Sequence, residues 1–140
     1  MILKWAEDLN IPYGDDEIPW CGLFVAHCVG SQLPDEPLPA NPLGAREWLT
    51  FGSPATDQPG AIMVFWRGAK NTFKGHVGLY AGEDGDHYHI LGGNQDNRVC
   101  VSRIAKDRKL GARWPATTMP PTGGRYRVND DGTPASNDEQ

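Results

Sequence analysis

Apolar residues in the first third of the chain recur at helical spacing. Residues 2–9 and 20–29 each carry a broad apolar stripe with a period of about 3.6 residues. Pro19 precedes the second stripe, at a position where helices often begin. A shorter pattern of the same kind covers residues 45–49, whereas the proline-containing segment 31–44 shows little periodicity. We therefore expect two short helices, an ordered loop and then one or two helical turns.

From residue 61 onward the pattern becomes that of strands. Residues 61–66 form a continuous apolar run, which is typical of a strand buried on both faces. Further stretches of strand composition follow, separated by polar turns, at 75–82, 87–92, 98–102 and 110–114. Helices followed by about five sequential strands predict an α+β domain with an antiparallel sheet.

The length and the tail composition predict one domain over residues 1–118. From 119 to 140 the chain is rich in small and polar residues, so we expect a flexible, disordered tail. The net charge of −5 argues against nucleic-acid binding, which requires clustered basic residues. We find neither an apolar run long enough to span a membrane nor the pattern of a signal peptide, and expect synthesis in the cytoplasm.

Acidic residues gather in the predicted turns. Residues 15–17 form one acidic group, and Glu83, Asp84 and Asp86 lie at the predicted hairpin turn. We expect both groups to be solvated rather than to face each other, as the paired carboxyl groups of a glycosidase do.

Cys21 lies at the predicted start of the second helix. The helix dipole and the unpaired N–H groups there favour an anion, so we expect the pKa of this thiol to be lowered and Cys21 to be a nucleophile. The alternative is that Cys21 is a small core residue, as most free cysteines are. On the first hypothesis Cys21 alkylates before Cys28 and Cys100, which we expect to be more deeply buried.

A thiol nucleophile needs a base and a group that orients the base. His76 follows a glycine at the start of a predicted strand, where the backbone would hold an imidazole rigidly. An antiparallel return brings residues near Asn94 beside it, so the Asn94 carbonyl oxygen can accept the imidazole N–H. Gln95 is an alternative orienting group. The other alternative is that this segment has no catalytic role and is an ordinary turn.

The other histidines are weaker candidates. His27 lies six residues after Cys21 and therefore faces away from it on a helix. His87 and His89 share one face of a strand, a spacing that suits a metal, but no third ligand accompanies them. We expect these two side chains to lie on an exposed strand face.

The order of four short blocks resembles the NlpC-type and CHAP-type cell-wall cysteine peptidases, and most closely a small phage-associated branch of them. The blocks are Trp20-Cys21-Gly22-Leu23-Phe24, Gly75-His76-Val77-Gly78, Leu91-Gly92-Gly93-Asn94-Gln95 and Gly111-Ala112-Arg113-Trp114-Pro115. The resemblance covers about residues 1–115. It implies a papain-like fold, with N-terminal helices and the nucleophile at a helix start packed on an antiparallel sheet of about five strands. It also implies hydrolysis of amide bonds in peptidoglycan stem peptides or cross-bridges.

The resemblance also implies roles for individual residues. Cys21 would be the nucleophile, His76 the base and later the acid, and Asn94 the orienting group. Weaker substrate or oxyanion contacts are assigned to Tyr13, Trp20 and Gln95. The chain departs from the family where many relatives have Asp-Cys-Ser in place of Trp20-Cys21-Gly22, and the third catalytic member there is often a histidine.

These expectations describe a monomeric peptidoglycan hydrolase without a metal or other cofactor. It would be a phage or prophage lysin or a virion-associated peptidase, acting on the cell wall or in the periplasm after release. Two other functions fit the same motifs: a toxin or deamidase that acts on other amides, and a catalytically inactive module that binds the wall.

Overall fold

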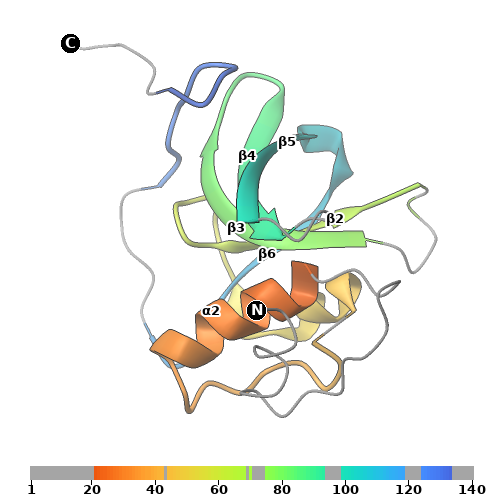
Figure 1. Ribbon diagram of the computed structural model, residues 1–140, viewed down its shortest axis with the longest axis vertical. Coiled ribbons are helices and arrows are strands. Elements are labelled where there is room, and N and C mark those ends of the chain that lie inside the picture. Colours follow the sequence, from red (N-terminus) through yellow and green to blue (C-terminus); the bar gives the residue numbers. More distant parts are fainter. Residues whose placement is uncertain are drawn as a thin grey trace.

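The computed structural model describes residues 21–42, 44–68, 70, 75–93, 99–118 and 124–133. One α-helix lies against a curled sheet (Figure 1). The helical elements are α2 (Cys21–Gln32) and the 3-10 helices η1 (Ala45–Thr50) and η2 (Lys106–Arg108). The strands are β1 (Ser53–Pro54), β2 (Ile62–Trp66), β3 (Gly75–Glu83), β4 (His87–Gly93), β5 (Val99–Ala105) and β6 (Lys109–Trp114).

The strands form one six-stranded sheet in the order β1-β6-β2-β3-β4-β5. Neighbouring strands pair antiparallel throughout. Strands β3, β4 and β5 follow one another as a meander, but η2 then carries the chain back to the far side of β2. There β6 pairs with β2, so β2 lies between β3 and β6.

The predicted papain-like fold, with N-terminal helices and about five strands, is wrong. The described residues form mostly a six-stranded antiparallel sheet with one α-helix and little other helical structure. The pattern at 45–49 gives a 3-10 helix, and the extra strand β1 arises because Ser53 and Pro54 pair with the end of β6. The helix expected over residues 2–9 lies outside the described residues.

Two apolar clusters cover the two faces of the sheet. Ile62 and Val64 pack in the cluster beneath α2 and η1, whereas Met63 and Phe65 pack in the cluster on the other face. Successive residues of a strand point to opposite faces, so a strand covered on both sides must be apolar at every position. The run that predicted a buried strand therefore serves both clusters, and α2 covers one of them (Figure 1).

Residues 124–133 pack along the end of β3. The Glu83 N–H donates to the Tyr126 carbonyl at 2.8 Å, the Val128 N–H donates to the Glu83 carbonyl at 2.8 Å, and Val128 is buried. This part of the range 119–140, which we expected to be a flexible tail, therefore pairs through its backbone with the end of β3. The remaining parts of that range lie outside the described residues.

Glu83 is a buried carboxylate with a full set of donors. Its side chain is 1% exposed and accepts hydrogen bonds from the Tyr80 hydroxyl at 2.6 Å, Lys106 at 2.6 Å and Arg125 at 2.8 Å. Burial alone raises the pKa of Glu83, but these donors bring the pKa below its usual value. The expectation of a solvated Glu83 was wrong because the 124–133 segment covers it.

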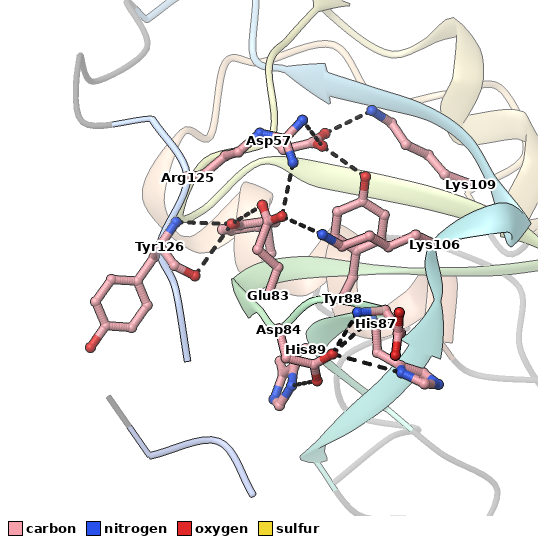
Figure 2. Close-up of polar contacts among 12 residues, drawn as sticks. Asp57, Glu83, Asp84, His87, Tyr88, His89, Lys106, Lys109, Arg125 and Tyr126 are labelled. Carbon is pink, nitrogen blue, oxygen red and sulfur yellow. Dashed lines mark hydrogen bonds and ion pairs between the residues drawn. The ribbon is translucent and has the colours of Figure 1, made fainter. Parts of the chain in front are cut away.

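Asp57 is a second buried carboxylate in the same polar network. It accepts hydrogen bonds from the Tyr88 hydroxyl at 2.8 Å and from Lys109 at 2.7 Å. The Arg125 guanidinium lies 3.4 Å from it and also binds Glu83, so one cation joins both acids (Figure 2). Burial raises the pKa of Asp57, but the bonds from Lys109 and Tyr88 outweigh burial and lower it.

We expect Arg125→Gln to lower the free energy of unfolding at pH 7 by about 1 kcal/mol, since the cation is partly exposed but both acids are buried. Arg127→Gln is the control, because Arg127 is exposed in the same segment. The folded-state pKa values of both acids are lowered, so their stabilisation is present above the unfolded pKa near 4 and is lost as the pH falls below it. Urea unfolding at several pH values measures this, and equal effects of the two variants at pH 7 would contradict it.

Candidate active site

Cys21 is the first described residue of α2 and lies against β3. The side chain is buried at 4% exposure and belongs to the apolar cluster that contains Val77. Backbone N–H groups of Val77, Gly22 and Cys21 itself form hydrogen bonds that favour the Cys21 thiolate. These N–H groups therefore favour the thiolate where the helix meets the strand.

His76 is the second residue of β3. It pairs across the sheet with Phe65 of β2 and is half-buried. Its ring lies over Gly92 of β4, where a Cβ would be 3.4 Å from the His76 Nε2 atom. A larger side chain at position 92 would crowd the imidazole, so the glycine leaves room for the ring.

The thiol and the imidazole lie on either side of the backbone at Val77. Val77 points to the cluster beneath α2, whereas His76 shares the face of its partner Phe65, which belongs to the other cluster. No direct thiol–imidazole hydrogen bond is present among the described residues. Arg67 and His76 line the same pocket. The charge of Arg67 favours the Cys21 thiolate and disfavours the His76 imidazolium. Catalytic hydrogen bonds are often long before substrate binds.

The expected lowering of the Cys21 pKa is wrong. Burial raises the pKa of this thiol, and the N–H donors and the Arg67 charge offset burial only in part. Burial and the Arg67 guanidinium lower the pKa of His76 to about 4. At neutral pH the pair therefore consists of a thiol and a neutral imidazole, which can accept a proton.

The other predicted site residues cannot be placed. Asn94 and Gln95 follow the last residue of β4 and lie outside the described residues, as do Tyr13 and Trp20. Sequence reasoning missed Arg67, which comes directly after the apolar run 61–66. The one feature of the sequence that could have indicated Arg67 is its position, because it follows a predicted buried strand and precedes the strand that begins near His76.

His87 and His89 bind an acid rather than forming an exposed strand face. His89 is 3% exposed, and its Nε2 atom lies 2.7 Å from Asp84. Arg103 also donates to Asp84, at 3.2 Å. His87 lies 3.8 Å from Asp84 (Figure 2). Burial raises the pKa of Asp84, but the bond from His89, two backbone N–H groups and Arg103 lower it far below its usual range. Asp84 is therefore buried, and the expectation of a solvated turn was wrong.

Comparisons with known proteins add no relative to this picture. No family model, curated protein or solved structure matches the chain. Within the described ranges, no helix has the length and apolar character needed to cross a membrane. The arrangement of Cys21, His76 and Arg67 is thus the basis for any inference about chemistry.

We expect iodoacetamide to modify Cys100 before Cys21 at pH 7. Cys21 is buried with a raised pKa, whereas Cys100 is half-buried on β5 at the edge of the sheet. Modification of Cys21 should accelerate only at a pH above the range in which an ordinary thiol ionises, because burial raises its pKa. Peptide mass spectrometry after timed labelling measures the order, and rapid labelling of Cys21 at neutral pH would show a thiolate that burial does not suppress.

Proposed function

We propose that this chain is a cysteine-dependent amide hydrolase with Cys21 as the nucleophile and His76 as the base. The observation that supports this most is the placement of both groups around Val77, with backbone N–H donors at the sulfur and the Arg67 charge nearby. A nucleophile, a base and preorganised donors are the parts that acyl transfer requires.

The proposed reaction begins with a neutral pair. His76 takes the thiol proton as the Cys21 sulfur attacks the amide carbonyl, which gives a tetrahedral oxyanion. The C–N bond then breaks, and the imidazolium gives its proton to the leaving amine. Water attacks the resulting thioester with His76 again as the base, and the acid product leaves the free thiol.

Backbone donors near the sulfur are suited to stabilise the oxyanion. The Cys21 and Gly22 N–H groups, which favour the Cys21 thiolate, are the groups that we assign to this role. In other enzymes the loss of one such donor raises the barrier by about 3–4 kcal/mol.

Amide bonds fit this site better than glycosidic bonds do. Glycosidases use two facing carboxyl groups. Among the buried acids that the structure describes, Asp57, Glu83 and Asp84 are each bonded to cationic side chains. The fourth, Glu36, accepts hydrogen bonds from Ala116 and Thr117, so none is free to serve in such a pair. We propose peptidoglycan as the substrate because of the motif order in the sequence.

We expect Cys21→Ala and His76→Ala each to reduce the release of new amino groups from purified peptidoglycan by about a thousandfold or more. Cys28→Ala, which removes another thiol of the same helix, is the matched control. Asn94→Ala should keep a measurable rate, because an orienting group contributes less than the nucleophile. Mass spectrometry of the muropeptides identifies the bond that is cut.

Each other outcome of that assay has a distinct meaning. Wild-type release by Cys21→Ala would overturn the mechanism, and new reducing sugar ends would indicate a glycosidase. Ammonia release from glutamine peptides without wall hydrolysis would indicate a deamidase. Wall binding without any released product would indicate a binding module.

The acidic limb of kcat/KM should lie near pH 4, because His76 must be neutral to accept the thiol proton and its pKa is about 4. Activity should then be level through neutral pH. Arg67→Gln should move this limb upward toward the ordinary histidine value of about 6.5, since removal of a nearby cation raises an imidazole pKa. A wild-type limb already near 6.5 would argue against His76 as the base.

A further inference from the structure

A pocket of about 190 Å³ lies beside His76. It is bounded by the end of β2, the start of β3, the middle of β5 and η2. His76 forms part of its wall. A group bound in this pocket would therefore lie against the imidazole that we propose as the base.

The lining of this pocket carries positive charge. Arg67 and Arg108 line it, and none of its described lining residues is acidic, although the whole chain has a net charge of −5. The buried acids Asp57 and Glu83 are held by other cations in the network of Figure 2. A concave site lined by one sign of charge attracts a ligand of the other sign, so this pocket favours an anion.

Arg108 is held in a defined orientation. Its guanidinium stacks over the Trp66 ring at 5.0 Å, and the Trp66 indole N–H donates to the Asp107 carbonyl at 3.3 Å. Stacking uses the face of a guanidinium and leaves donors at its edge, which match a carboxylate. The Ser102 hydroxyl adds another polar group to the lining.

The size and the apolar walls restrict the ligand further. Pockets for whole drug-sized ligands measure about 300–1,000 Å³, so this one suits a group the size of an amino-acid side chain. Phe65 is fully buried and lines the pocket together with Ile104. These features fit a carboxylate on a short aliphatic stem.

We propose that this pocket binds a carboxylate of the substrate peptide, held by Arg67 and Arg108 and placed beside His76. The inference rests on the proposed function and adds that the substrate carries an acidic group close to the amide that is cut.

The test compares two nearly isosteric probes whose α-carboxyl group is blocked, the N-methylamides of N-acetyl-glutamate and N-acetyl-glutamine, by calorimetric titration of the wild type and Cys21→Ala. We expect the glutamate probe to bind at least about tenfold more tightly and to shift the His76 imidazole resonances. Arg67→Gln and Arg108→Gln should each weaken glutamate binding about tenfold and leave glutamine binding unchanged. Arg127→Gln, which removes an exposed guanidinium outside the pocket, should have no effect.

Equal affinity for the two probes, or wild-type glutamate binding by both pocket variants, would overturn this inference. Its failure is distinguishable from that of the proposed function. Selective glutamate binding without any amide hydrolysis would support the proposed carboxylate site and reject the proposed hydrolase activity. If peptides that differ only in an acid or its amide were hydrolysed at equal rates, the proposed hydrolase activity would be supported and the proposed carboxylate site would be rejected.

Discussion

Strand β3 is covered on both faces, and this constraint determines where the candidate groups lie. Val77 must point into the cluster beneath α2, so His76 before it must point to the opposite face. Cys21 packs in the same cluster as Val77, whose backbone N–H favours the Cys21 thiolate. The thiol and the imidazole meet there through a strand backbone rather than inside one cavity.

Burial has opposite consequences for the two groups. It raises the pKa of Cys21 and lowers the pKa of His76, so each is held in its neutral form. Arg67 stabilises the thiolate and further disfavours the imidazolium. The two groups therefore form no ion pair. In the mechanism that we propose, proton transfer would accompany attack on the substrate, and solvent exclusion would strengthen the donors that face the oxyanion.

The sequence allowed the apolar strand at 61–66 and the glycine-led strand at His76 to be predicted, because both depend on local patterns. The layering could not be predicted in the same way. The pairing of β6 with β2 and the addition of Ser53 to the sheet join segments that are distant in the sequence, so the local pattern of apolar residues does not predict them. The prediction of a lowered Cys21 pKa was wrong. The sequence indicated N–H donors at a helix start, which lower a thiol pKa, but it did not show how deeply the side chain is buried, and burial raises the pKa.

The partners of the acidic residues could not be predicted from local patterns either. Glu83 and Asp84 stand in a sequence typical of a solvated turn, but Arg125 and Arg103 reach them from segments 42 and 19 residues away. The pocket beside His76 likewise joins residues that are distant in the sequence, because Arg67 and Arg108 both line it.

The central claim is that the Cys21 sulfur forms a covalent bond to the substrate acyl group. Acid quenching of the protein during turnover of a peptidoglycan peptide, followed by peptide mass spectrometry, tests it directly. The account predicts a thioester adduct on Cys21 that is absent from Cys21→Ala. Continued hydrolysis by Cys21→Ala, or an acyl adduct on another residue, would contradict it.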